Sequence, residues 1–170
     1  QHDTDAITGI QTIYYYPEIS NPPAKLISEL IETHHDGYTH ILCHSDTTGK
    51  DYLPYYCGRN LHHMISDVRK IHSNHTFERA IYAGAAIQTV ESSYSPQVIS
   101  IRGIYFTQDI KPYSPTIETH TFSANEYQPT LVSPPKQDNK LSDLTSADVV
   151  VSGGRGFGPE DAFQQLYQLA

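Results

Sequence analysis

Short apolar strands alternate with helical patterns at the start of this chain, and this alternation constrains the fold more than any other feature. Residues 7–15 and 39–44 are rich in β-branched and aromatic side chains, which are typical of strands. One helical pattern lies between them, and a second follows the turn 45–50 and reaches about Met64. Alternation of this kind predicts an α/β fold, with a parallel sheet and helices on its faces.

Both helical patterns carry boundary signals. Ser20-Asn21 predicts an N-cap for the first helix, Pro22-Pro23 its first turn, and Gly37 its end. For the second helix, Thr47 or Thr48 is the predicted N-cap. The apolar face of the first helix comprises Leu26, Ile27, Leu30 and Ile31.

After residue 68 the helical patterns stop, and β-rich runs follow one another. Short β-rich runs, separated by Gly, Ser or Pro, occur at residues 77–82, 86–90, 98–102 and 116–122. They predict further strands without helices between them. Residues 123–144 follow with several prolines, many polar side chains and no sustained periodicity, which is typical of a linker.

A second strand-and-helix pattern begins near the C-terminal end. Residues 147–152 predict a buried strand, residues 153–158 form a glycine-rich turn, and Pro159 opens a predicted helix bearing Phe163, Leu166 and Leu169. The helical pattern runs to Ala170 without a capping signal, and the chain begins with Gln1 rather than Met. We interpret the chain as an interior piece or a processed product.

Charge and composition exclude several functional classes. The 170 residues carry 11 Lys plus Arg against 19 Asp plus Glu, a formal net charge of -8, with no basic stripe. A nucleic-acid binder held by phosphate contacts is therefore not expected. No run approaches the roughly 18 apolar residues that span a bilayer, so no transmembrane segment is predicted. Cys43 and Cys57 are too few for a disulfide framework and lack the close pairing of a redox or zinc motif.

The glycine-rich turn 153–158 is the sharpest candidate for chemistry. A strand that runs through small residues into a helix N-terminus presents free backbone N–H groups to an anion, and Arg155 adds a fixed positive charge. The spacing matches neither the dinucleotide fingerprint nor a P-loop. The local pattern leaves two interpretations open, a cofactor-contacting turn and a tight strand-to-helix connection with a solvated arginine.

Other patterns give weaker indications. Lys50, in the turn 47–51, could meet a nucleotide phosphate, but the P-loop pattern is incomplete there. The ten histidines show no paired ligand spacing, so no metal site is predicted, and no catalytic triad is assigned. Asp67, Glu78 and Glu91 are interpreted as ion-paired or solvated carboxylates.

Four strings, in this order, resemble the alpha subunit of electron transfer flavoproteins. They are residues 47–54 (TTGKDYLP), 66–68 (SDV), 77–86 (FERAIYAGAA) and 149–156 (VVVSGGRG). The resemblance covers nearly the whole chain. Three positions depart from the family pattern, because Tyr55 stands for an arginine, Ala80 for a proline and Ala85 for an asparagine.

The resemblance implies a domain organisation. In that family the first domain is a Rossmann-like three-layer α/β domain of the adenine nucleotide alpha hydrolase-like type, which embraces a beta subunit, and the second domain binds FAD. We therefore expect the first domain, with added β-rich strands, over residues 1–123, a linker over 124–146, and the first βα unit of the FAD-binding domain over 147–170. The expected cofactor-binding residues are Gly153, Gly154, Arg155 and Gly156.

The resemblance also implies a function. An alpha subunit is an electron carrier without substrate chemistry of its own, which passes electrons from dehydrogenases, such as the acyl-CoA dehydrogenases of fatty acid β-oxidation, to a quinone oxidoreductase and the respiratory chain. Arg155 would lie close to the isoalloxazine ring, stabilise negative charge on a reduced flavin and raise its potential. The family works in the mitochondrial matrix and in the bacterial cytoplasm.

Two alternatives remain open from the sequence. The family's later FAD-binding motifs lie beyond Ala170, so FAD binding by this chain alone is expected to be weak or absent. The first alternative is accordingly a structural or interaction module without a flavin. The second is a nucleotide-binding domain that uses the turn Thr48-Gly49-Lys50.

Overall fold

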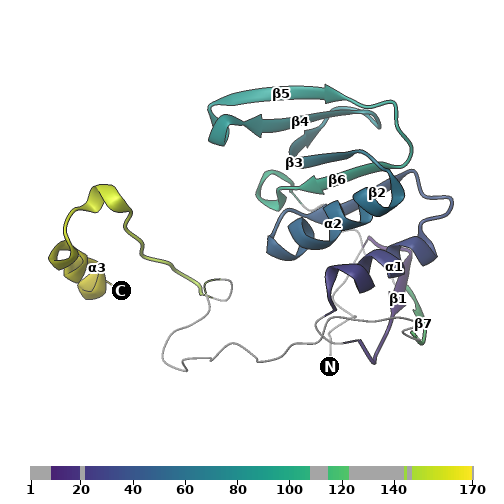
Figure 1. The fold of residues 1–170 in the computed structure, drawn as a ribbon, viewed down its shortest axis with the longest axis horizontal. Coiled ribbons are helices and arrows are strands. Elements are labelled where there is room, and N and C mark those ends of the chain that lie inside the picture. Colours follow the sequence, from purple (N-terminus) through teal and green to yellow (C-terminus); the bar gives the residue numbers. More distant parts are fainter. Residues whose placement is uncertain (1–8, 20–21, 108–114, 123–143, 145–146, 170) are drawn as a thin grey trace. The chain divides into compact units, whose positions relative to one another are not determined.

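The computed structural model describes residues 9–19, 22–107, 115–122, 144 and 147–169. Contacts along the chain divide it into two units, Gln1–Pro129 and Thr130–Ala170, and each is described by itself (Figure 1). No helix in the described part of the chain is long and apolar enough to cross a membrane.

A mixed five-stranded sheet organises the first unit, with the order β2-β6-β3-β4-β5 among the described residues. The strands are β2 (His40–His44), β6 (Gln97–Ile101), β3 (Met64–Ile71), β4 (Thr76–Ile81) and β5 (Ala86–Glu91). β2 and β3 both run parallel to β6, which lies between them, while β4 and β5 continue the sheet antiparallel (Figure 1). The predicted α/β class, with a parallel core and added β-rich strands, is confirmed.

Two helices accompany this sheet in the described part of the first unit. α1 (Ala24–His34) and α2 (Thr47–Asn60) pack against each other, and α2 also contacts β2 and β6. The buried positions of α2 fall three or four residues apart on one face, which is the period of an amphipathic helix. They are Gly49, Leu53, Tyr56 and Cys57.

The hydrophobic core forms two clusters, because successive side chains of β6 point to opposite faces of the sheet. Val98 packs with the α2 residues Leu53, Tyr56 and Cys57 and with Cys43 of β2. The next residue of β6 belongs to the second cluster, which consists of Ile99, Ile65, Val68 and Phe77. Partly buried Phe106 packs against this second cluster.

The helix boundaries correct several sequence predictions. α2 is capped by Asp46, whose carboxylate accepts a 2.7 Å hydrogen bond from the Gly49 N–H, so the predicted Thr47 or Thr48 cap is wrong. Asp46 has the extended backbone that a cap requires, whereas the threonines already belong to the helix. The helix ends at Asn60, so Met64 belongs to β3 and not to a helix.

At α1, Pro23 occupies the cap position without a side-chain cap bond, and the predicted cap Ser20-Asn21 lies outside the described residues. The helix ends at His34, with His35 as its C-cap, so Gly37 lies beyond the helix end that it was predicted to mark. Gly37 itself has a positive φ of 84° in the following turn.

A second, two-stranded sheet pairs β1 (Thr12–Tyr15) in parallel with β7 (Thr116–Thr119). Both strands lie inside runs that the sequence predicted. Tyr16, directly after β1, forms a 2.7 Å hydrogen bond through its hydroxyl with Nε2 of His34 at the end of α1. The small sheet is therefore tied to α1.

The second unit consists, in its described residues, of two 3-10 turns and one short helix. They are η4 (Arg155–Phe157), η5 (Glu160–Phe163) and α3 (Gln164–Leu169), so the helix predicted from Pro159 begins as a 3-10 turn. The predicted linker 124–146 lies outside the described residues except for Leu144.

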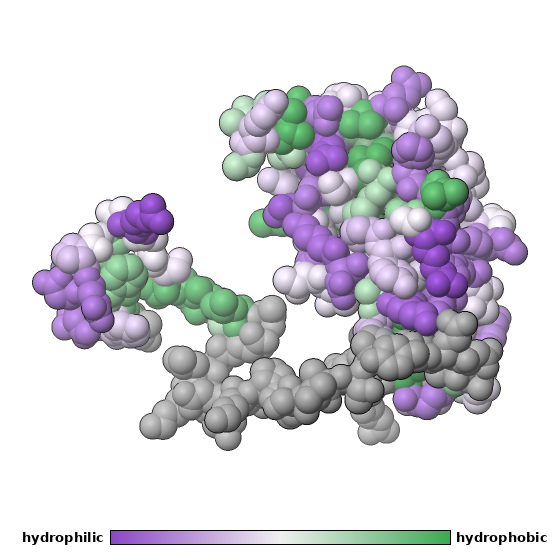
Figure 2. All heavy atoms as spheres, viewed as in Figure 1, coloured by the Kyte–Doolittle hydropathy of each residue, from purple (hydrophilic) through white to green (hydrophobic). Residues whose placement is uncertain are grey.

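The strand predicted over residues 147–152 is wrong for the described structure, which assigns no strand there. Val149 and Val150 are 81% and 51% exposed, and this segment shows as an apolar stretch on the surface of the second unit (Figure 2). A buried strand needs neighbouring strands to satisfy its backbone and cover its faces, and no described strand pairs with this segment.

Candidate functional site

The glycine-rich turn of the second unit makes a sharp change of direction. Gly154 is extended, with φ -95° and ψ -174°, and its carbonyl accepts a 2.9 Å hydrogen bond from the Phe157 N–H across η4. Gly158 follows with φ 116°, a value that only glycine adopts without strain. The backbone therefore turns within residues 154–158 and runs on into η5.

The three glycines of the predicted site differ in their surroundings. A Cβ at Gly153 would lie 2.7 Å from Cδ1 of Leu166, so this glycine permits close packing of α3. A Cβ at Gly154 or Gly156 would have no atom of a described residue within 4 Å. Gly153 thus has a packing role, while Gly154 and Gly156 leave the backbone open to the approach of another molecule.

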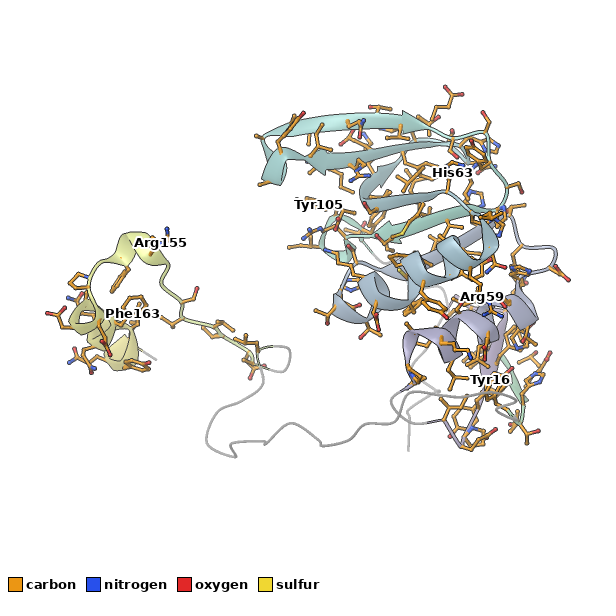
Figure 3. The ribbon with its side chains drawn as sticks, viewed as in Figure 1. Tyr16, Arg59, His63, Tyr105, Arg155 and Phe163 are labelled. Atoms are coloured by element: carbon orange, nitrogen blue, oxygen red, sulfur yellow. The ribbon has the colours of Figure 1, made fainter. Side chains whose placement is uncertain are left out.

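Arg155 lies on the outside of this turn (Figure 3). It forms no hydrogen bond, ion pair or ring contact with any residue that the structure describes. The Phe157 and Phe163 rings pack edge to face beneath the turn, 5.5 Å apart. The exposed guanidinium of Arg155 is therefore available to an anionic group beside an apolar pair of rings.

A second polar site surrounds Asp67 in the first unit. Its Oδ1 atom accepts hydrogen bonds from the Ser45 hydroxyl at 2.5 Å and from Arg102 Nε at 2.9 Å. Lys50 Nζ lies 3.4 Å from the same oxygen. Ser45 and Arg102 directly follow β2 and β6, so the carboxyl ends of two parallel strands meet at this carboxylate.

The backbone at Asp67 has an unusual conformation, and the strand pairing beside it is irregular. The residue has a φ of 58°, its N–H donates a 3.0 Å hydrogen bond to the buried Ser100 hydroxyl, and the pairing of β3 with β6 shifts register between Ile65 and Val68. Burial raises the pKa of the Asp67 carboxyl, but the Ser45 hydrogen bond and the charges of Arg102 and Lys50 outweigh burial and hold the pKa below its ordinary value. The Asp67 side chain is therefore an ionised carboxylate that binds three neighbouring side chains.

The turn 47–51 is not arranged as a phosphate loop. Lys50 points to Asp67, and a Cβ at Gly49 would overlap the carbonyl oxygen of His44, so this glycine serves the packing of α2 against β2. The structure thus gives a structural role to the turn for which the sequence left nucleotide binding open.

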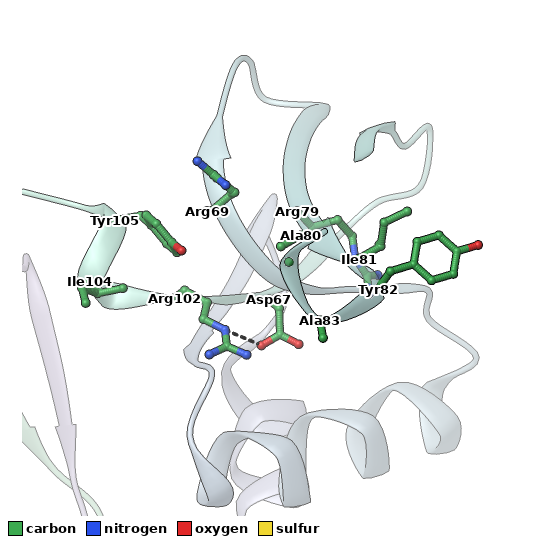
Figure 4. Close-up of a pocket in the computed structure, with 11 residues that line it drawn as sticks. Asp67, Arg69, Arg79, Ala80, Ile81, Tyr82, Ala83, Arg102, Ile104 and Tyr105 are labelled. Atoms are coloured by element: carbon green, nitrogen blue, oxygen red, sulfur yellow. Dashed lines mark hydrogen bonds and ion pairs between the residues drawn. The ribbon is translucent and has the colours of Figure 1, made fainter. Parts of the chain in front are cut away.

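A cavity of about 690 Å³ opens beside Asp67 (Figure 4). Its lining comes from β3, from β4 and the following turn η2 (Tyr82–Gly84), and from Arg102 with the turn η3 (Gly103–Tyr105). Two of the strings that resemble the flavoprotein family, 66–68 and 77–86, therefore meet around one cavity. Sequence reasoning missed this cavity, although the shared family strings were the signal that could have found it.

The other sequence candidates have simpler roles. Asp67 and Glu78 are ion-paired as interpreted, the latter with Arg69 Nε at 3.2 Å. Within the described residues, no group of three or more His, Cys, Asp or Glu side chains is arranged to hold a metal ion. Among the histidines, His34 stacks on Tyr14 with ring centroids 3.9 Å apart, and burial lowers its pKa.

Comparisons with known proteins place the chain in a family. The family model described as the electron transfer flavoprotein domain matches residues 17–125. Electron transfer flavoprotein subunit alpha of Pseudomonas aeruginosa is 34% identical over 92% of this chain and 50% of that protein. The same subunit of Paracoccus denitrificans is 32% identical over 92% of this chain and 49% of that protein.

A mitochondrial alpha subunit is also similar to this chain. Electron transfer flavoprotein subunit alpha, mitochondrial, of Oryza sativa subsp. indica is 30% identical over 98% of this chain and 48% of that protein. The chain spans about half the length of these curated relatives. It belongs to the electron transfer flavoprotein family and is similar to the alpha subunits of that family.

Proposed function

We propose that this chain serves in the alpha subunit of an electron transfer flavoprotein and carries electrons through FAD held together with a beta subunit. Dehydrogenases such as acyl-CoA dehydrogenases would supply the electrons, and a quinone oxidoreductase would pass them to the respiratory chain. Family membership supports the electron-transfer role, and the relatives are named as flavoproteins. Within the chain, the supporting observation is the exposed Arg155 between the open glycines 154 and 156.

The residues of the glycine-rich turn fit the anionic and electron-accepting parts of such a cofactor. Gly154 and Gly156 have no atoms where a side chain would be, so a flat ring or a phosphate can approach the backbone closely. Bound FAD would supply the redox chemistry. The positive charge of the Arg155 guanidinium would stabilise negative charge beside it, which favours the reduced form of the flavin.

The proposal includes partners and a compartment. The domains we propose remain those inferred from the sequence, with residues 1–123 facing a beta subunit and residues 147–170 opening the FAD-binding domain. The relatives include bacterial and mitochondrial proteins, which supports the bacterial cytoplasm or the mitochondrial matrix as the compartment.

Co-expression with a beta subunit tests the proposal. A longer form of the chain that continues through the FAD-binding domain, co-expressed with a beta subunit of this family and supplied with FAD, is expected to purify as a yellow complex. Arg155→Ala is expected to lower the reduction potential of the flavin, because the positive charge beside it is lost, and Arg155→Lys retains part of the effect. Arg59→Ala is the matched control, since Arg59 lies in the first unit with its Nε 2.9 Å from Glu32.

The outcomes separate the two parts of the proposal. A colourless complex that does not take up added FAD would contradict the flavoprotein role. It would favour an interaction module without a flavin, for which the exposed Val149 and Val150 offer an apolar contact segment. A yellow complex whose potential is the same in Arg155→Ala would remove Arg155 from the site and leave the family role intact.

A further inference from the structure

The cavity beside Asp67 concentrates positive charge. Three of the five arginines of the chain, Arg69, Arg79 and Arg102, line it, although the chain as a whole has a formal charge of -8. Among the described residues that line the cavity, Asp67 is the single carboxylate, and it is already engaged by Ser45, Lys50 and Arg102. The walls of the cavity therefore carry a net positive charge.

Arg79 supplies an unsatisfied donor. Its Nε atom is buried and has no hydrogen-bond partner among the described residues. A buried N–H without an acceptor is costly, and native proteins leave few of them. Arg79 also lines the cavity, so a small shift of its side chain would let an acceptor in the cavity pair with this donor.

The other two arginines retain donors for the same acceptor. Arg102 meets Asp67 through Nε, and Arg69 meets Glu78 through Nε, at 2.9 Å and 3.2 Å. A guanidinium carries five donors in a planar fork, so these Nε contacts do not use the Nη groups. Arg69 is further held by its position 4.9 Å from the centre of the Tyr105 ring.

The rim of the cavity is apolar. Tyr82, Ile104 and Tyr105 line it and are 81%, 89% and 54% exposed (Figure 4). Tyr82 and Ala83 have φ values of 50° and 53°, a conformation that is strained for residues other than glycine and that occurs preferentially at functional sites. The volume of about 690 Å³ is within the range of small-molecule sites and exceeds what a bare phosphate needs.

We propose that this cavity binds a phosphomonoester whose organic body is aromatic. The dianionic phosphate would lie against Arg79 and the Nη groups of Arg69 and Arg102, and the ring would lie on the Tyr105 side of the rim. Several guanidinium forks around one site favour phosphate over carboxylate, because a phosphate offers three oxygens and a second charge. The site is built from residues of the first unit, and its test does not need FAD.

Calorimetric titration of the chain with phenyl phosphate tests the proposal. Binding with a stoichiometry of one that weakens as salt is raised is expected. Benzoate has one charge fewer and phenol has no charge at neutral pH, so both are expected to bind more weakly. Ribose 5-phosphate keeps the phosphate and lacks the aromatic ring, so it is also expected to bind more weakly than phenyl phosphate.

Charge variants locate the ligand. Arg79→Gln is expected to weaken phenyl phosphate binding about tenfold, the loss of one hydrogen bond between charged groups. Because Ile104 is 89% exposed, Ile104→Glu and Ile104→Lys change the charge of the rim without disturbing the core, and they are expected to weaken and strengthen binding respectively. Arg59→Gln, outside the cavity, is the control and is expected to leave binding unchanged.

Several results would overturn the proposal. They are no binding of phenyl phosphate, equal binding of benzoate, tighter binding of ribose 5-phosphate, or affinities that do not respond to either Ile104 variant. The Ile104 pair keeps the test decisive if Arg79→Gln fails to fold. An acidic peptide that binds where phenyl phosphate does not would likewise replace the small ligand by a protein partner.

Discussion

Replacing Asp67 by asparagine removes the negative charge on which Ser45, Lys50 and Arg102 converge. Asparagine keeps the shape and tolerates the φ of 58°, so the variant isolates the charge. The Lys50 and Arg102 side chains are 48% and 51% exposed, so each ion pair contributes only about 0.2–1 kcal/mol. Weakening of the Ser45 hydrogen bond adds about 1 kcal/mol, and we expect a total loss of about 1.5–3 kcal/mol at neutral pH.

Urea unfolding followed by circular dichroism measures this loss, and its pH dependence gives a stricter test. The folded-state pKa of Asp67 is lowered, so its contribution to stability is present above the unfolded-state pKa of about 3.9 and is lost as the pH falls through the folded-state pKa. The difference between the wild type and Asp67→Asn is therefore expected to shrink as the pH falls below about 4.

Asp51→Asn, on the exposed side of α2, is the matched control and is expected to change stability by less than about 0.5 kcal/mol. A difference between the wild type and Asp67→Asn that stays constant down to acidic pH would refute the reasoning. Equal stability of the two proteins at neutral pH would do so as well.

Two further predictions concern α2 and the cysteines. Gly58→Ala is expected to stabilise the chain by about 0.5–1 kcal/mol, because a Cβ there meets no described atom and alanine is the better helix former. Gly49→Ala is expected to destabilise the chain, because its Cβ would overlap the His44 carbonyl oxygen. Equal urea midpoints for the two variants would contradict this contrast. Burial raises the pKa of Cys57 to about 11 and also raises the pKa of buried Cys43. Because the thiolate is the reactive form, iodoacetamide near pH 8 is expected to leave both thiols unmodified in the folded chain and to alkylate both in urea. Rapid alkylation of the native chain, detected by mass spectrometry, would show that this part of the core opens readily.

The sequence predicted elements well wherever the local pattern was enough. The runs around β4, β5 and β6 are rich in β-branched and aromatic residues, and all three form strands. β3 was not predicted, because its sequence Met-Ile-Ser-Asp-Val-Arg-Lys-Ile mixes charged and apolar residues and its register shifts near Asp67. The strand prediction over residues 147–152 was wrong for a different reason. The apolar composition of this segment predicts a strand, but no described strand pairs with it.

The two candidate sites were predictable to different degrees. The glycine-rich turn is contiguous in the sequence, so its residues could be named in advance, and their contact with FAD stays a prediction. The cavity takes its arginines from positions 69, 79 and 102, which come together only through the pairing of β3 with β4 and β6. No local spacing rule connects these positions.

The place of β6 in the sheet sets the order in which the first unit can be completed. β6 lies between β2 and β3, yet Gln97–Ile101 comes after both of them and after the β4–β5 hairpin in the chain. Val98 and Ile99 supply one residue to each core cluster, so neither cluster is whole until this strand has been inserted. During synthesis, residues 40–96 can form α2 and the β4–β5 hairpin, but both core clusters stay incomplete until Gln97–Ile101 has emerged.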